Sequence, residues 1–236
     1  MDFTAETRVA DIAATNPATI KVFQQHRIDF CCGGRIPLAE ACARHGLDAD
    51  ALLDELHHVE RIPEGWPDWE RSSLTALIAH IQGRYHERLR RELPRLEAML
   101  AKVVERHGDR LPGVLRPLQV TFDRFKRELL EHMAKEDAVL FPAIVAAEET
   151  VGRNEQPDGS WGWIERPIEA LMREHDFAGT ALEAMRELTL GYVPPQDACP
   201  TFRGLYHGLA ELHDDMHLHV HLENNVLFPR VARLAR

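Results

Sequence analysis

Two short stretches far apart in the chain share one pattern, and this repeat limits what the chain can fold into. HMAKEDAVLFP runs from His132 to Pro142 and HVHLENNVLFP from His219 to Pro229, both of the form H-x-x-x-E-x-x-x-L-F-P. Residues four apart lie on one face of an α-helix, so each stretch points an imidazole and a carboxylate the same way. The repeat therefore predicts two helices that carry matched His–Glu pairs.

In both stretches the polar pair interrupts a row of apolar residues that would face the core. One row contains Phe122, Phe125, Leu129, Val139 and Leu140, and the other contains Leu212, Met216, Val226 and Leu227. An unpaired carboxylate in a core costs at least several kcal/mol, so Glu136 and Glu223 need a proton, a cationic partner or a metal. No Lys or Arg lies on these rows, and histidines are the partners that the sequence offers.

Two further periodic segments supply inward histidines. His175 stands in the apolar row Ile164, Ile168, Leu171, Ala178, Leu182 and Met185. Residues 71–107 contain two candidates, His80 and His86. At roughly 100° per residue, His86 lies near the edge of its apolar row and His80 points nearly opposite, which favours His86. His107, near a helix end, is a weaker replacement for His86.

The predicted ligand set draws on four helices and consists of His86, His132, Glu136, His175, His219 and Glu223. A single core histidine is more often structural, but inward polar residues on every row argue for a metal site. Imidazole with carboxylate suits iron, manganese or zinc, and two carboxylates among four histidines can bridge a pair of metals. The remaining histidines are predicted to be solvated, supporting or surface residues: His26, His45, His57, His58, His207, His213, His217 and His221.

Helical periodicity dominates the chain and strand-like alternation is nearly absent, so the predicted fold class is all-α. Residues 71–236 contain four long periodic segments separated by stretches rich in Pro and Gly, which is typical of an up-down four-helix bundle. Residues 1–60 predict a small domain of short helices. Residues 61–70, rich in Pro and Trp, predict a linker between the two.

The motif DFCCGG places Cys31 and Cys32 side by side in the small domain. Adjacent cysteines form a strained ring when bonded to each other, so no structural disulfide is expected. One interpretation is a buried pair that packs a turn. The other is a pair of thiolates beside flexible glycines, Gly33 and Gly34, that cap the first helical segment and let the thiols handle iron or nitrosyl groups. Cys42 and Cys199 lack this setting.

Composition excludes several classes of protein. The formal net charge of −10 argues against a nucleic-acid-binding surface. The N-terminus has no signal-peptide pattern, and no apolar run is long enough to cross a membrane. Four irregularly spaced cysteines do not form a secreted disulfide framework. These observations predict a soluble cytoplasmic protein with no nucleic-acid or membrane partner.

The histidine-rich bundle resembles hemerythrin, and it lacks the Glu-x-x-His motifs of ferritin-like di-iron proteins. With DFCCGG near the start and LENNVLFP near the end, the whole chain resembles the iron-sulfur cluster repair di-iron family called Repair of Iron Centers. The resemblance implies a hemerythrin-like bundle that holds two iron ions per chain, oxo-bridged and carboxylate-bridged. Its ligands fall on the six residues already named, and its cysteine pair on Cys31 and Cys32.

The same resemblance implies a bacterial stress-response protein that restores iron-sulfur clusters damaged by nitric oxide or peroxide. The site would supply iron, or bind and reduce nitric oxide in a nitric oxide reductase-like activity, and the cysteine pair would mediate transfer. Expected partners are damaged iron-sulfur proteins or a cluster scaffold, the small molecules NO and O2, and a second copy in a homodimer. The alternative is a hemerythrin-like oxygen or nitric oxide sensor, and an iron store is disfavoured by the single small site.

Overall fold

The computed structural model describes residues 3–59, 67–153 and 162–234, and these are almost entirely helices and turns. No strand forms within these ranges, where an isolated antiparallel bridge pairs Arg8 with Pro37. The all-α prediction is confirmed. The predicted linker falls largely outside the described residues. In the described part of the chain, none of the helices has both the length and the apolar character needed to span a bilayer.

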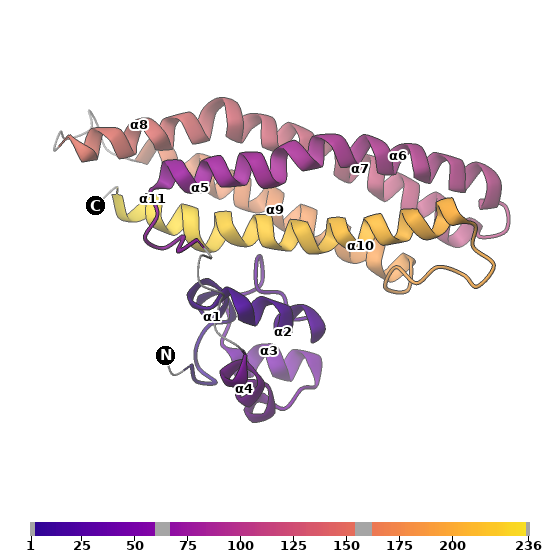
Figure 1. Cartoon of the computed structure of the whole chain (residues 1–236), viewed down its shortest axis with the longest axis horizontal. Coiled ribbons are helices and arrows are strands. Elements are labelled where there is room, and N and C mark those ends of the chain that lie inside the picture. The colour runs from indigo at the N-terminus through magenta and orange to yellow at the C-terminus, as the bar shows by residue number, and fades with distance from the viewer. Residues whose placement is uncertain (1–2, 60–66, 154–161, 235–236) are drawn as a thin grey trace. The chain divides into compact units, whose positions relative to one another are not determined.

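The chain divides into two compact units, residues 78–216 and residues 1–77 with 217–236. The first of these is built on long helices that run alongside one another (Figure 1). In chain order the helices and the π-helical turns that interrupt them are α5 (Leu74–Ile81), η2 (Gln82–His86), α6 (Glu87–His107), α7 (Pro112–Lys135), η3 (Glu136–Leu140), α8 (Phe141–Gly152), α9 (Gly162–Leu188) and α10 (Pro200–His221). Both α6 and α9 pack against α7, so the predicted helical bundle is confirmed.

Rows of large apolar residues fill the interior of this unit. On α6 the buried row consists of four leucines and Val103, and on α7 it includes Phe122 and Phe125, both with no exposed surface. Burying each such side chain stabilises the fold by about 1.5–3 kcal/mol. Gly208 on α10 allows a close approach to α6, because an added Cβ would lie 2.6 Å from Cδ2 of Leu96. The bundle core therefore needs large apolar side chains at most positions and a glycine where α10 approaches α6.

The other unit combines the N-terminal helices with the end of the chain. Its helical elements are α1 (Val9–Thr15), η1 (Pro17–Thr19), α2 (Ile20–Gln25), α3 (Leu38–His45), α4 (Ala49–His58), the π-helical turn η4 (Leu222–Leu227) and α11 (Phe228–Leu234). Gly46 ends α3 at a φ of 66°, a left-handed conformation that glycine adopts without strain. Asp48 caps α4 by accepting hydrogen bonds from the backbone of Asp50 and Ala51.

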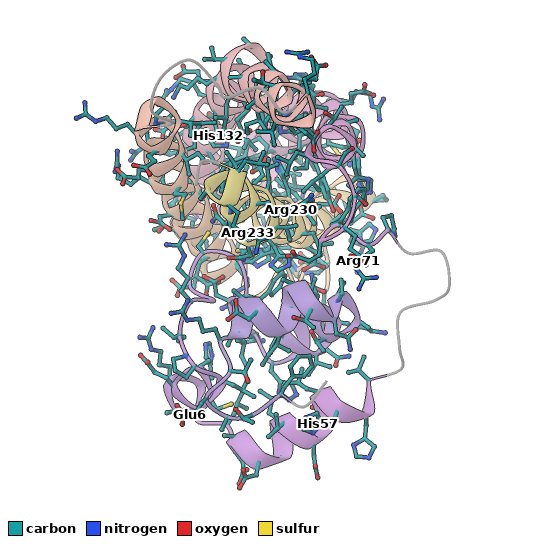
Figure 2. The ribbon with its side chains drawn as sticks, turned by 90° about the vertical axis from the view of Figure 1, so that its left-hand side faces the viewer. Glu6, His57, Arg71, His132, Arg230 and Arg233 are labelled. Carbon is teal, nitrogen blue, oxygen red and sulfur yellow. The ribbon has the colours of Figure 1, made fainter. Side chains whose placement is uncertain are left out.

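Contacts between distant parts of the sequence hold this unit together. Helix α1 packs against η4. Arg230 on α11 donates to the backbone carbonyls of Trp69 and Ser72, close to Arg71 (Figure 2). The sequence predicted that Gly33 and Gly34 cap the first helical segment. They do not, because α2 already ends at Gln25. The end of the chain is thus fixed against its beginning.

Candidate metal centre

All six predicted ligands are buried, with at most 3 % of each residue's surface exposed. His132 lies among the side chains inside the bundle (Figure 2). The six come from different helical elements: His86 from η2, His132 from α7, Glu136 from η3, His175 from α9, His219 from α10 and Glu223 from η4. The structure therefore withdraws every one of these polar groups from water.

The six side chains form two groups of four, and in each group the ligand atoms lie within 4.8 Å of one another. The first group consists of His86, Glu136, His219 and Glu223, and the second of His132, Glu136, His175 and Glu223. The two glutamates belong to both groups. Each group thus combines two imidazoles with two carboxylates, a donor set that suits a cation.

The carboxylate of Glu136 is the clearest sign that this cluster suits a cation. Its Oε2 lies 3.5 Å from Nε2 of His86, and its Oε1 lies 3.3 Å from Nε2 of His132. Neither oxygen accepts a hydrogen bond, although the side chain has no exposed surface. A buried carboxylate without hydrogen bonds is costly unless a positive charge compensates it. The residues present therefore fit bound metal ions.

The histidines also converge on common points. Nε2 of His175 lies 2.9 Å from Nε2 of His132, so two nitrogen lone pairs can address one position. Nε2 of His219 lies 2.9 Å from Oε1 of Glu223, the same i,i+4 arrangement as His132 and Glu136. The repeat in the sequence thus produces the same His–Glu pairing twice.

Three of the four ligand-bearing helices depart from α-helical geometry at the ligand. The π-helical turns η2, η3 and η4 contain His86, Glu136 and Glu223 respectively. A π-helical turn runs its hydrogen bonds from i to i+5, so it holds one residue more than an α-turn and rotates the helix beyond it. This explains why His86 is fully buried and Val139, predicted to face the core, is 67 % exposed.

A carboxylate stands behind His86 on the side away from Glu136. Nδ1 of His86 donates to Oδ1 of Asp137 at 3.0 Å, and Asp137 also accepts hydrogen bonds from Gln82 at 2.8 Å and from Arg90. Burial alone would raise the pKa of Asp137, but the hydrogen bonds from Arg90, Gln82 and His86 outweigh it and lower that pKa. The anionic Asp137 fixes the Nδ1 proton of His86 and leaves Nε2 for a metal.

His132 has an equivalent partner in Glu174. Its Nδ1 lies 2.8 Å from Oε2 of Glu174, and Lys135 donates to the other oxygen of Glu174 at 2.5 Å. Burial opposes ionisation of Glu174, but Lys135 and His132 outweigh it and lower its pKa. A cavity of about 280 Å³ is lined by these residues and by His175. It offers small molecules an approach to the His132 and His175 side of the cluster.

The cysteine turn is well ordered by one side chain. The carboxylate of Asp29 accepts hydrogen bonds from the backbone N–H groups of Cys31, Cys32 and Gly33 at 2.9, 3.0 and 2.8 Å. An added Cβ on Gly34 would lie 2.6 Å from the carbonyl oxygen of Phe30. The glycines therefore serve close packing of this turn, and not the flexibility that the sequence suggested.

The two thiols differ in environment. Neither forms a disulfide, and their sulfur atoms lie 3.7 Å apart. Cys31 is buried and Cys32 is half-buried. A hydrogen bond with Cys32, burial, and the charge of Asp29 raise the pKa of the Cys31 thiol. Cys31 is therefore the buried member of the pair, and Cys32 is the more accessible one.

Sequence reasoning misses three supporting residues and leaves a fourth between two roles. Asp137 and Glu174 adjoin ligands in the sequence, a signal that could identify them, and Asn225 follows Glu223 at a spacing of two. The sequence groups His221 with solvated or supporting histidines, but it is only 2 % exposed, and burial lowers its pKa to about 4. Its Nδ1 lies 3.4 Å from the carbonyl oxygen of Phe30.

The other candidate histidines lie apart from the two ligand groups. His80 is half-buried on α5 and stacks edge-on against Tyr85. His107 ends α6 with its Nε2 3.6 Å from Sγ of Cys199. Neither belongs to a group of buried potential ligands in the described part of the chain.

Comparison with known proteins places this geometry in context. Residues 77–231 match the family described as Hemerythrin HHE cation binding domain, and residues 5–60 match a domain of unknown function, DUF542. The protein class that the helical bundle and its buried His–Glu cluster define is therefore the hemerythrin-like cation-binding protein.

Relatives along nearly the whole chain narrow this class. The iron-sulfur cluster repair protein YtfE of Yersinia pseudotuberculosis serotype O:1b (strain IP 31758) is 40 % identical over 222 residues, which cover 94 % of this chain and 95 % of the relative. The protein of the same name from Yersinia pestis (strain Pestoides F) matches with the same identity and coverage. The chain belongs to the family of these iron-sulfur cluster repair proteins.

Proposed function

We propose that this protein repairs damaged iron-sulfur clusters, and that the six buried His and Glu side chains hold two iron ions. The observation that carries the proposal is the sharing of Glu136 and Glu223 by two groups of four buried ligands. A single metal ion in one group would leave the two histidines of the other group without a metal to bind. The names of the relatives support repair as the purpose of the site.

Each residue type then has a distinct task. Glu136 and Glu223 would serve both metal ions, with His86 and His219 completing one group and His132 and His175 the other. Asp137 and Glu174 hold the Nδ1 protons of His86 and His132, which orients both rings. Bound iron would supply the capacity to bind nitric oxide and to change oxidation state.

The cavity beside the cluster and the cysteine turn suit the delivery of iron to a damaged protein. The cavity beside Glu174, Lys135 and His175 gives a small molecule such as NO or O2 a route towards the cluster. Cys32 offers an accessible thiol to a damaged iron-sulfur protein or a cluster scaffold, in the reducing cytoplasm where cysteines stay free. Iron handed to that partner is then the cargo of the reaction.

The test is recovery of a damaged enzyme. An iron-sulfur hydratase inactivated by nitric oxide is mixed with the iron-loaded protein, and its activity is followed over time. Recovery that requires the iron-loaded form supports the proposal. An equal rate of recovery with the iron-free protein, or with free ferrous iron at the same concentration, would contradict it.

The cysteines separate repair from sensing. The Cys31→Ser, Cys32→Ser double variant should keep its iron, because neither residue belongs to the ligand groups, and should fail to restore the damaged enzyme. If the protein is instead a sensor, the double variant should still bind the small molecule, and neither the variant nor the wild type should restore the enzyme. Cys199→Ser is the matched control and should repair at the wild-type rate. Full repair by the double variant would reduce the pair to a packing role.

A further inference from the structure

The stretch from the end of α10 into η4 carries two of the ligands. It also carries a second pair of polar side chains, offset from the ligands by two residues. His219 and Glu223 are followed at this offset by His221 and Asn225. His221 and Asn225 contact the backbone of Phe30, whereas His219 and Glu223 belong to the ligand groups, so the two pairs lie on different faces. One turn of helix thus presents a ligand face and a second polar face.

The second face contacts the cysteine turn directly. Nδ2 of Asn225 donates to the carbonyl oxygens of Phe30 at 3.1 Å and of Cys31 at 3.2 Å. The same Nδ2 also lies 3.1 Å from Nδ1 of His221, so the two N–H groups of the amide face three partners. The carbonyl groups of Phe30 and Cys31 are therefore both held by Asn225 from η4, and the Phe30 carbonyl has a longer contact, 3.4 Å, with Nδ1 of His221.

This contact is packed as well as hydrogen-bonded. The ring of Phe30, itself 1 % exposed, lies edge-on to His221 with centroids 5.5 Å apart and tilted to His217 at 6.0 Å. Water cannot easily replace Asn225 in such a setting, and loss of its donor would remove a hydrogen bond from each of two buried carbonyls and leave Phe30 with the 3.4 Å contact from His221. Both the clamp and the cysteine turn belong to one compact unit of the chain.

We propose that Asn225 is a positioning residue that couples metal binding by His219 and Glu223 to the conformation and reactivity of the Cys31–Cys32 turn. When the ligand face of this turn of helix is drawn onto metal, the clamp face moves with it, because the two faces share one backbone. The Phe30 and Cys31 carbonyls follow, and the exposure of the Cys32 thiol changes. The coupling rests on the proposed function for its purpose, namely that the thiols act when iron is present.

The experiment measures thiol reactivity, not repair. The full-length chain is prepared iron-loaded and iron-free, and the rate at which N-ethylmaleimide alkylates Cys32 is followed by peptide mass spectrometry. We expect iron loading to change the wild-type rate by about fivefold or more, the lower end of typical coupling between sites. Asn225→Asp has the same shape but no N–H donor, and its two rates should be nearly equal while its iron content is retained.

Asn16→Ala is the matched control, because Asn16 caps the short helix η1 in the same unit and makes no hydrogen bond to the cysteine turn. It should keep the wild-type ratio of rates. A ratio of one in the wild type, or an undiminished ratio in Asn225→Asp, would overturn the coupling.

A second measurement needs no substitution. Coupling between two sites is reciprocal in binding free energy, so alkylation of Cys32 in the wild type should change the affinity for iron, although not by the factor measured for the alkylation rate. A chelator titration of alkylated and untreated chains reports it, and unchanged affinity would overturn the proposal. Failure of the enzyme-recovery test with both ratios intact would instead remove the repair function and leave the coupling in place.

Discussion

Replacement of Asp137 by Ala tests how far the carboxylate behind His86 contributes to metal binding. Loss of a carboxylate that orients a ligand histidine typically lowers metal affinity by 10–100-fold, or about 1.4–2.7 kcal/mol. His86 has no exposed surface and the Asp137 side chain is only 21 % exposed. An Nδ1 donor left buried without an acceptor costs about 1–3 kcal/mol. We therefore expect a loss near 100-fold, the upper end of that range.

Two variants calibrate this effect. Glu174→Ala removes the equivalent partner of His132, but the Glu174 side chain is 36 % exposed, so water can take its place. Its loss of affinity should be nearer 10-fold, the lower end of the same range. Asp137→Asn keeps an acceptor for His86 but loses the charge that faces Arg90. Its loss of metal affinity should lie between those of the two alanine variants.

The assay is an anaerobic titration of each iron-loaded variant with a ferrous chelator, with bound iron counted at every step. Asp123→Ala provides the control, because Asp123 is exposed on α7 and should leave affinity unchanged. An affinity within twofold of the wild type for Asp137→Ala would refute the argument that this carboxylate orients His86. Equal losses in Asp137→Ala and Glu174→Ala would refute the argument from exposure.

Burial and geometry lead to three further predictions. His86→Ala should lose or weaken one of two bound irons, whereas His80→Ala should retain both, measured as iron per chain; the reverse would assign the ligand to α5. Replacing Glu136 and Glu223 together by Ala should abolish iron binding, and because two buried carboxylates are removed, urea unfolding of the iron-free chain should show no loss of stability. The pKa of the Cys31 thiol is raised in the folded state, so above the ordinary thiol pKa of 9.0 the folded chain keeps a proton that the unfolded chain releases. The free energy of unfolding should therefore be unaffected by this group below pH 9.0 and should fall as the pH rises above it. Cys31→Ala should reduce this loss of stability at alkaline pH, measured by urea unfolding. An unchanged dependence of the unfolding free energy on pH would contradict the raised pKa of Cys31.

Local regularity explains what the sequence by itself determined. A histidine and a glutamate four residues apart share one helical face wherever the helix lies, so the two repeated pairs could be identified without any tertiary information. The apolar rows around them predicted the burial of both pairs and of His175. The same periodicity predicted an all-α chain with a helical bundle, because 3.6-residue patterning is imposed by burial of one face of each helix.

Only the tertiary structure decided the features that depend on contacts between distant segments. Asp137 and Glu174 are ordinary acidic residues in the sequence, and they support His86 and His132 because neighbouring helices bring them within hydrogen-bonding distance. The burial of Cys31 beside an accessible Cys32 also has no sequence signature, since both share the same neighbours.

The π-helical turns show the same limit within a single helix. Helical phase counted at 100° per residue placed His86 at the edge of its row and Val139 inside, because that count assumes an unbroken α-helix. The extra residue in each turn rotates the helix beyond it. A turn of this kind is less favourable locally than an α-turn and forms where packing and the convergence of ligands compensate for it. Those contacts come from other helices, so the final direction of these side chains is a property of the folded chain.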